Sequence, residues 1–458
     1  MKQRLILVLI SSLLVFIVFF TVMVGVDSPE QAITTPKQSG EGVAIEKAFR
    51  KAVGTNGIQL QYPTEGDYKS AFVTKNLDDD EEEEALVFYS NDTADTNVHI
   101  RVLDKQDGKW TSISDIKGYG NKIDSISFDD LNGDSIPELV TSWSLYDSNS
   151  SRILTVQSST ASSKEPLTTI ANQSYSYMGI ADMDNDGINE ILVIWNETKD
   201  KLQKTYASLL KMENETITQL GDNAKLDANA AVYSSFKVQH TGNQPVAFID
   251  AMKADNSMIT EVLSYNRSSG RLEAPFTANP SITNTKTLRT PAIPSMDIDG
   301  DGVIEIPVPY GNAIQDSPVP QTVVGTGTET PENDEERLFL TSWYNVTSPF
   351  TGAMSEKSYA FVNADYKCMI KVTNGYRQNL MAYRNKKNGR VTVYSSSGGI
   401  TRGRPLFTVT FTRHMKGEET YTYKKQLGDV IAYGTLTEEG KNAGFTNEKI
   451  AQLLTYYR

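Results

Sequence analysis

Short apolar runs rich in β-branched and aromatic residues recur through the first two thirds of the chain, each directly after a cluster of acidic side chains. Four such runs occupy residues 85–89, 139–143, 191–195 and 306–310. Runs of this length bounded by polar turns are typical of β-strands. Two prolines weaken the strand pattern in the fourth run. We expect each run to be a strand that leaves an acidic loop.

The spacing of these runs predicts a repeated unit of four strands. The acidic clusters begin 54, 52 and 115 residues apart, so the last interval is close to twice the others. Residues 236–250 supply the missing unit, with two strand-like runs around a turn at Gly242 and Asn243 but no acidic loop. Each unit has room for two more strands, for example at residues 98–103 and 110–113. Four strands per unit of about 50 residues is the pattern of a β-propeller blade, whereas β-solenoid repeats are shorter.

Each acidic cluster places oxygen-bearing side chains at the same four positions of a short loop. A carboxylate or an amide stands at positions 1, 3 and 5, and a glutamate stands at position 9. Such oxygens on alternate residues of a tight turn can converge on a hard cation, and we expect Ca²⁺, which takes roughly six to eight oxygen ligands. The candidate metal ligands are, in loop 1, Asn76, Asp78, Asp80 and Glu84; in loop 2, Asp130, Asn132, Asp134 and Glu138; in loop 3, Asp182, Asp184, Asp186 and Glu190; and in loop 4, Asp297, Asp299, Asp301 and Glu305.

The position of the glutamate separates these loops from EF-hands, in which a glutamate closes the loop at its twelfth position between two helices. The twelfth position of loop 3 is Val193, inside a predicted strand. Loops 3 and 4 have Gly187 and Gly302 at position 6, where loops 1 and 2 have Glu81 and Ser135, so loops 3 and 4 are the better candidates. Each loop could also be only a solvated acidic turn. Bound Ca²⁺ would stiffen the turn and add to the folding free energy.

The predicted fold is mainly β: a β-propeller of about five four-stranded blades with Ca-binding-type loops, followed by a small α+β domain. We assign residues 1–26 to a signal anchor or transmembrane segment and residues 27–55 to a linker with a short helix. The propeller occupies residues 56–362, and a sixth blade completed by flanking segments is the alternative. The basic C-terminal domain occupies residues 363–458, with a closing helix at residues 446–457.

The N-terminus predicts the compartment. Residues 5–26 are uncharged and follow Lys2 and Arg4. This stretch is long enough to cross a hydrocarbon core of roughly 30 Å, and no small-residue cleavage site stands before Asp27. We expect a single-pass membrane protein with a cytoplasmic N-terminus; a cleaved signal and secretion are the alternative. Either way residues 27–458 would lie outside the cytoplasm, where Ca²⁺ on the order of millimolar fills even weak loops.

Charge reverses along the chain, whose formal net charge is −13. Residues 365–425 carry thirteen Lys or Arg against three acids, which indicates a module with its own partner. Outside the cell that partner would be an anionic envelope polymer or an acidic lipid surface, and we expect no nucleic acid. Alternatively, these cations are solvated or pair with acids of the same chain. Residues 312–337 form a low-complexity insert that ends in acids, either a spacer or a binding loop.

Signals for catalysis are few. The single cysteine, Cys368, allows no intramolecular disulfide and is expected to be a buried apolar residue. Neither zinc-ligand spacing nor a nucleophile motif includes His99, His240 or His414. We therefore expect a protein that is not an enzyme. The alternative is an extracytoplasmic enzyme that acts on polysaccharide, because two of the many acids could meet in the fold.

The acidic loops resemble the FG-GAP or VCBS-type repeats of integrin-like propellers. Residues 36–40, 59–63 and 70–73 are similar to the start of VCBS-repeat proteins exported by clostridia-like Gram-positive bacteria, and the resemblance covers roughly residues 36–345. It implies loops that bind Ca²⁺ and a propeller that serves as an adhesion or ligand-binding platform. The function that we expect is a membrane-tethered, extracytoplasmic, calcium-binding module that binds a protein or a glycan at the cell surface.

Overall fold

The computed structural model is mainly β, with a few short helices. It describes residues 40–457 except 79, 92–94, 145–151, 160–166, 214, 278–282, 291, 310–333, 377–378, 398–400 and 415–419. The predicted membrane segment and most of the low-complexity insert lie outside the described residues. Within the described part of the chain, no helix is long and apolar enough to cross a membrane.

The first sheet begins the series of antiparallel units and carries the N-terminal helix. Its strands are β2 (Phe72–Lys75), β3 (Glu84–Asn91), β4 (Asp95–Gln106) and β5 (Lys109–Lys117), with β1 (Ile58–Leu60) also paired to β3. Helix α2 (Gly40–Val53) contains the predicted short helix, and its Phe49 is fully buried against Phe72 and Tyr89. This contact fixes the helix on the sheet.

Three further units follow with the same order of neighbouring strands. The second sheet contains β6 (Lys122–Asp129), β7 (Glu138–Ser144), β8 (Arg152–Ser158) and β9 (Thr168–Tyr175); the third contains β10 (Tyr177–Ala181), β11 (Glu190–Lys199), β12 (Leu202–Glu213) and β13 (Thr216–Leu226); the fourth contains β14 (Ala230–Thr241), β15 (Gln244–Lys253), β16 (Met258–Asn266) and β17 (Arg271–Glu273). One parallel pairing, Asp222 to Arg271, joins the third and fourth units. The turn predicted at Gly242 and Asn243 connects β14 to β15, which confirms a unit without an acidic loop.

The fifth unit and the C-terminal sheet exchange strands. The fifth sheet contains β18 (Glu305–Pro309), β20 (Leu340–Ser348), β21 (Ala353–Asn363), β22 (Cys368–Val372) and β28 (Leu454–Tyr456); the C-terminal sheet contains β19 (Glu335–Leu338), β23 (Leu380–Asn385), β24 (Val391–Ser397), β25 (Thr401–Thr412), β27 (Val430–Gly434) and β26 (Tyr423–Leu427). Thus β19 leaves the fifth unit for the C-terminal sheet, and β28 returns from the C-terminus to pair with β22.

Two short helices, α3 (Glu438–Asn442) and α4 (Asn447–Leu453), complete the C-terminal region. The prediction of one helix over residues 446–457 was right at its start, where the Thr446 side chain accepts a hydrogen bond from the backbone N–H of Lys449. It was wrong at its end, because Leu454–Tyr456 form β28. The open edge of β22 provides backbone partners that a helix would not use.

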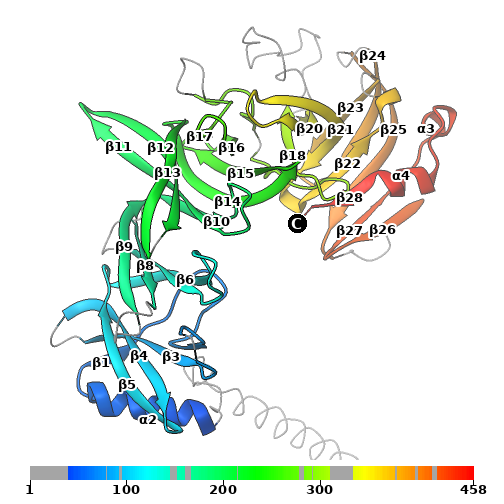
Figure 1. Ribbon diagram of the computed structural model, residues 1–458. Coiled ribbons are helices and arrows are strands. Elements are labelled where there is room, and N and C mark those ends of the chain that lie inside the picture. The colour runs from blue at the N-terminus through cyan, green and yellow to red at the C-terminus, as the bar shows by residue number, and fades with distance from the viewer. Residues whose placement is uncertain are drawn as a thin grey trace, which may run out of the picture.

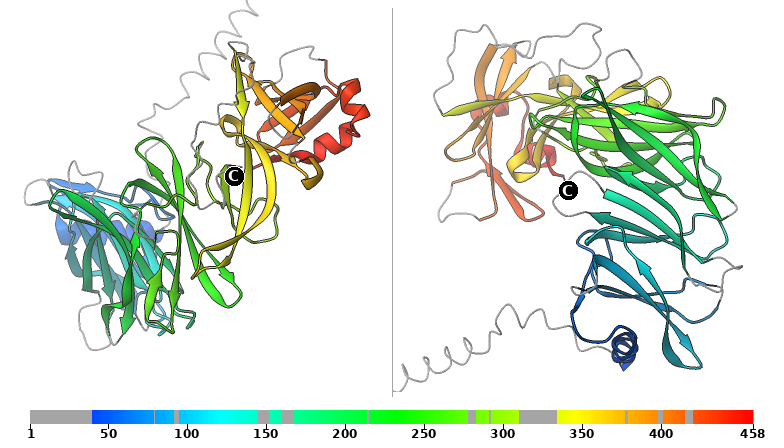
Figure 2. Two further views of the ribbon diagram at one scale, coloured as in Figure 1. Left: turned by 90° about the horizontal axis from the view of Figure 1, so that it is seen from above. Right: turned by 90° about the vertical axis from the view of Figure 1, so that its left-hand side faces the viewer.

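Neighbouring sheets pack face to face in chain order. Buried apolar clusters join the first sheet to the second, the second to the third, the third to the fourth and the fourth to the fifth. Figures 1 and 2 show the sheets following one another along an open arc, with the blue first sheet and the yellow fifth sheet well apart. These four apolar clusters therefore each lie between two successive sheets.

Candidate metal centres

All four acidic loops occupy the same place in the fold, the turn that joins two neighbouring antiparallel segments. The residue just before each loop is paired with the glutamate that ends it. These pairs are Lys75 with Glu84, Asp129 with Glu138, Ala181 with Glu190, and Met296 with Glu305. The strands thus place every position-9 glutamate at the base of its loop, where it faces the turn.

The loop carboxylates hold the turn through backbone hydrogen bonds. In every loop the Oε2 atom of the glutamate accepts a hydrogen bond from the backbone N–H of position 2, at 2.6 to 2.9 Å. The side chain at position 5 accepts one from the N–H of position 7, at 2.8 to 2.9 Å. In loops 2, 3 and 4 the position-1 aspartate accepts at least two more. These bonds give the turn its shape and leave other oxygens directed inward.

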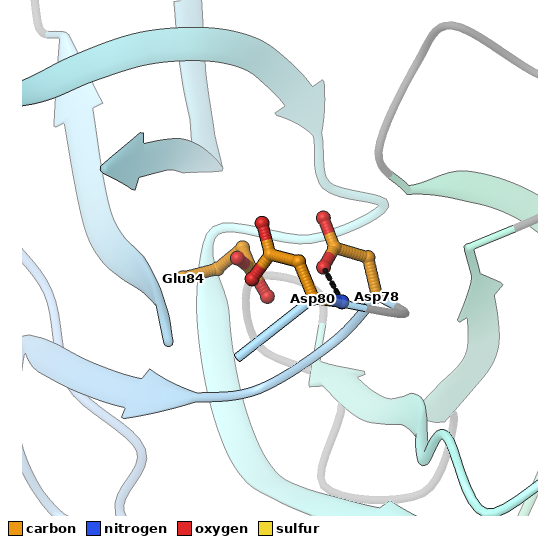
Figure 3. A group of neighbouring side chains, drawn as sticks. All are labelled: Asp78, Asp80 and Glu84. Carbon is orange, nitrogen blue, oxygen red and sulfur yellow. Dashed lines mark hydrogen bonds between the residues drawn. The ribbon is translucent and has the colours of Figure 1, made fainter. Parts of the chain in front are cut away.

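Three of the loops gather carboxylates closely enough to share one ion. Figure 3 shows Asp78, Asp80 and Glu84 of loop 1 on one side of the turn. Within each of the three groups the ligand oxygens lie within 4.8 Å of one another; the groups are Asp78, Asp80 and Glu84; Asp182, Asp184 and Glu190; and Asp297, Asp299 and Glu305. Loop 2 forms no such carboxylate group among the described residues, and its Asn132 instead donates hydrogen bonds to Asp134 and Glu138.

The second oxygen of the position-9 glutamate divides the loops into two kinds. In loops 2 and 3 this Oε1 atom accepts a hydrogen bond, from the Ser158 hydroxyl to Glu138 at 2.9 Å and from the Lys211 ammonium to Glu190 at 2.8 Å. In loops 1 and 4 the Oε1 atoms of Glu84 and Glu305 are buried without a hydrogen-bond partner in the described structure. A buried carboxylate oxygen with no donor is costly unless a cation or a proton satisfies it.

Burial also raises the pKa values of these two glutamates. Burial raises the pKa of Glu84 to about 7 against the opposing hydrogen bond from Leu77, and nearby carboxylates add to the shift. Burial likewise raises the pKa of Glu305 to about 7, although its carboxylate accepts a hydrogen bond from Ile298. Both side chains belong to residues that are 0% exposed. Without a cation, each site therefore disfavours its own negative charge.

The next strand contributes a residue to each site that the sequence analysis missed. It lies level with the position-9 glutamate and is Asp104 in loop 1, Ser158 in loop 2, Lys211 in loop 3 and Asn345 in loop 4. The Oδ1 atoms of Asp104 and Asn345 are also buried without a hydrogen-bond partner in the described structure, so loops 1 and 4 each gain one more available oxygen. In the first three units this residue follows the glutamate by 20 or 21 positions, a signal that could have identified it.

In loop 3 a lysine ammonium already stands among the carboxylates. The Nζ atom of Lys211 lies 2.7 Å from Asp184, 2.6 Å from Asp186 and 2.8 Å from Glu190, and its side chain is only 11% exposed. Although burial alone would lower it, these three hydrogen bonds raise the pKa of Lys211, so the cation is held. Arg267 adds a second positive charge, 3.0 Å from Asp184. Loop 3, one of the two better candidates by sequence, thus contains its own cation.

Loop 4 also has a neighbouring lysine, but it lies at the rim. The Nζ atom of Lys357, on β21, is 2.6 Å from Asp301 and 3.5 Å from Asp299, and its side chain is 33% exposed. No contact to Glu305 is formed, so the buried oxygen of that glutamate stays without a partner. An ion could take the inner position of loop 4 if Lys357 moved outward.

Part of the positive charge in the C-terminal region is neutralised within the chain. Acids at the end of the low-complexity insert, on and before β19, pair with cations of the C-terminal sheet: Glu336 with Arg384, Glu335 with Arg402, and Asp334 with Lys387. These pairs support the alternative that cations of the basic segment pair with acids of the same chain. Two further cations of the segment are also paired within the chain, Arg404 with Glu439 and Arg413 with Asp429.

Comparison with solved structures finds distant similarity to the two proteins below. No protein-family model and no curated protein matches the sequence. An endo-arabinase from Bacteroides thetaiotaomicron is 10% identical with a TM-score of 0.24, over 67% of this chain and 99% of the arabinase. A hypothetical protein from Leishmania major is 9% identical with a TM-score of 0.22, over 80% of this chain and 93% of that protein. Similarity at this level assigns neither a family nor an activity to the chain.

Proposed function

We propose that this protein is an extracytoplasmic, calcium-stabilised β-propeller-type module that binds a protein or a glycan at the cell surface, and that its ions bind in loops 1 and 4. The observation that carries the metal assignment is the pair of buried, unpartnered oxygens of Glu84 and Glu305. Each belongs to a cluster of carboxylates that a divalent cation would neutralise.

The donor set fits Ca²⁺ better than a transition metal. Loop 1 offers the carboxylates of Asp78, Asp80, Glu84 and the neighbouring Asp104, while loop 4 offers three carboxylates and the amide oxygen of Asn345. All of these donors are oxygen atoms, which hard cations prefer, whereas zinc and copper sites use histidine or cysteine. Backbone oxygens and water would complete the coordination.

The role that we assign to the ions is structural. In each site the position-9 glutamate already ties the base of the turn to the following strand, and like charges in the same turn repel one another. A bound cation would remove that repulsion and stabilise the hairpin. Lys211 performs this task in loop 3, and the Ser158 and Asn132 hydrogen bonds perform part of it in loop 2.

Calorimetric titration of Ca²⁺ into the purified, chelator-treated full-length chain tests the metal assignment. We expect two ions per chain, and we expect Glu84→Gln and Glu305→Gln each to remove one. The matched control is Glu138→Gln in loop 2, which should still bind two ions because Ser158 satisfies that glutamate. Absence of Ca²⁺ binding, or loss of an ion in the control but in neither of the two variants, would contradict the proposal.

The surface location rests on the uncharged N-terminal segment at residues 5–26. Cell fractionation tests it: the full-length chain should remain with the membrane after a high-salt wash and be accessible to protease added from outside. Recovery from the cytosol would contradict this part of the proposal and leave the metal sites unaffected.

No specific observation favours the polysaccharide-acting enzyme over the binding module. A second group of acids, Asp227, Asp250 and Glu261 in and beside the fourth sheet, is fully buried and held by internal hydrogen bonds and ion pairs. Enclosed carboxylates of this kind hold neighbouring segments together and are not exposed to a polymer. We therefore propose the binding function alone.

A further inference from the structure

A pocket of about 580 Å³ lies where the fifth sheet meets helix α4. Residues of β21 and β22 line it together with residues of α4. Helix α4 contacts β22 (Figure 1). This volume is within the range of small-molecule sites, roughly 300 to 1,000 Å³. Two of its lining residues, Lys357 and Lys371, also contact loop 4.

The charge of the lining is one-sided. Three lysines, Lys357, Lys371 and Lys449, line the pocket, and no aspartate or glutamate does. This is unusual for a chain with a net charge of −13. Lys371 and Lys449 make no ion pair with a carboxylate among the described residues; their Nζ atoms donate to the backbone carbonyl oxygens of Ile298 and Gly444, at 3.0 and 2.8 Å. Each ammonium group has two further hydrogens to donate.

The rest of the lining is mostly apolar. Val372 and Leu380 contribute from the strand side, and Phe445 and Leu453 contribute from beside and within α4. A concave apolar surface with a few convergent charged groups binds a molecule that has an apolar body and a charged head group. We infer that this pocket binds a small organic anion, a phosphate or a carboxylate joined to an apolar body.

Lys357 connects the pocket to loop 4. Its ammonium now contacts Asp301 and Asp299, and Asp299 belongs to the group of carboxylates that a divalent cation in loop 4 would use. A bound Ca²⁺ would compete for these oxygens and repel the ammonium, which would then be free to turn into the pocket that it lines. This link rests on the proposed function. Binding of Ca²⁺ in loop 4 would release Lys357 as a third ammonium group in the pocket, beside Lys371 and Lys449.

The first experiment titrates 1-naphthyl phosphate and 1-naphthoate into the full-length chain in the presence of a chelator. We expect saturable binding of at least one of the two, and at least tenfold weaker binding of inorganic phosphate and of neutral 1-naphthol. Lys449→Gln and Lys371→Gln should each weaken binding at least tenfold. Lys424→Gln, an exposed lysine outside the pocket, should leave it unchanged. Failure of both anions to bind, or binding by both pocket variants as tight as binding by the parent protein, would overturn the assignment.

The second experiment repeats the titration with saturating Ca²⁺. We expect the naphthyl anion to bind several-fold more tightly, and we expect this gain to vanish in Lys357→Met and in Glu305→Gln. Unchanged anion affinity when calorimetry shows that Ca²⁺ has bound would overturn the link through Lys357. If Ca²⁺ does not bind at all, the proposed metal sites fail, whereas the result in chelator still decides the pocket.

Discussion

At the scale of single residues, the identity of one side chain on the neighbouring strand decides what each loop can hold. Asp104 and Asn345 add an oxygen to loops 1 and 4, whereas Ser158 satisfies the glutamate of loop 2 and Lys211 fills loop 3. The four loops share one pattern of oxygen-bearing positions, but this residue is an acid in loop 1, a hydroxyl in loop 2, a lysine in loop 3 and an amide in loop 4. A buried ammonium and a divalent cation exclude each other through like-charge repulsion.

Replacement of this lysine should convert loop 3 into a metal site. Lys211→Met leaves Asp184, Asp186 and Glu190 without their internal cation, and removal of one partner from a buried charge cluster costs about 3 to 5 kcal/mol. We expect a lower melting temperature in chelator, its recovery in Ca²⁺, and three bound ions in place of two by calorimetry. Lys204→Met, an exposed lysine on the same strand β12, should show none of these effects. A count of two ions in Lys211→Met would contradict this prediction.

The buried glutamate of the fourth sheet should make stability depend on pH. Burial raises the pKa of Glu261 to about 7, against the hydrogen bond from the Asp227 backbone N–H. Because the folded state favours the protonated form of Glu261, this side chain contributes most to the free energy of unfolding below its unfolded pKa of about 4.5. That contribution is lost as pH rises through the folded pKa of about 7. The loss amounts to about 3 kcal/mol.

Glu261→Gln removes this titration. Between pH 4.5 and pH 8 the free energy of unfolding of the variant should therefore fall by about 3 kcal/mol less than that of the parent. The measurement is the free energy of unfolding across this range at saturating Ca²⁺. Glu197→Gln, at an exposed position on β11, is the control and should follow the parent. Identical pH profiles for the parent and Glu261→Gln would show that the carboxylate does not titrate differently on folding.

At the scale of strands and sheets, the third and fourth units pack closely enough to require a glycine at their contact. The first strands of the third and fourth units, β10 and β14, meet where the Phe236 ring lies over Gly179. A Cβ atom at position 179 would lie 2.4 Å from that ring, nearer than atoms can approach. Glycine is therefore required here for packing.

Gly179→Ala should destabilise the protein by about 1 to 3 kcal/mol, because the ring must move in a well-packed interface. The smaller side chain of Phe236→Leu should make room for the methyl group, so the double variant should lose less than the sum of the two single variants. Chemical denaturation of all four proteins measures this coupling. Strict additivity would mean that the two residues do not meet.

At the scale of the whole molecule, the proposed ions lie near the two ends of the arc, in the first and fifth sheets (Figure 1). Ligands that bind only the folded state stabilise it, by about 2.7 kcal/mol per site at a concentration one hundred times the dissociation constant. Chelation should therefore lower the melting temperature of the full-length chain, and Ca²⁺ should restore it. Mg²⁺ should be the weaker substitute, because it needs stricter octahedral geometry. Equal melting temperatures with and without Ca²⁺ would contradict structural metal sites.

Much of the mainly-β organisation follows from local sequence pattern. Period-2 and continuous apolar runs predicted the strands after each acidic loop, and Gly242 with Asn243 marked the hairpin of the unit that lacks a loop. Thr446 marked the start of α4 because a capping hydroxyl acts within one turn. Burial of Cys368 was also correct, since it lies in an apolar run whose strand is covered on both faces.

The sequence by itself determined the strands, the acidic loops and the two to four residues that shape each turn, because these depend on neighbours within about ten positions. Only the tertiary structure decided which loops have an unsatisfied oxygen, because Asp104, Lys211 and Asn345 reach their loops through pairing with another strand. It also ended the last helix at Leu453, since the edge of β22 was open to receive β28. Charge and hydrogen-bonding partners inside a fold are set by residues distant in sequence, and local patterns do not record them.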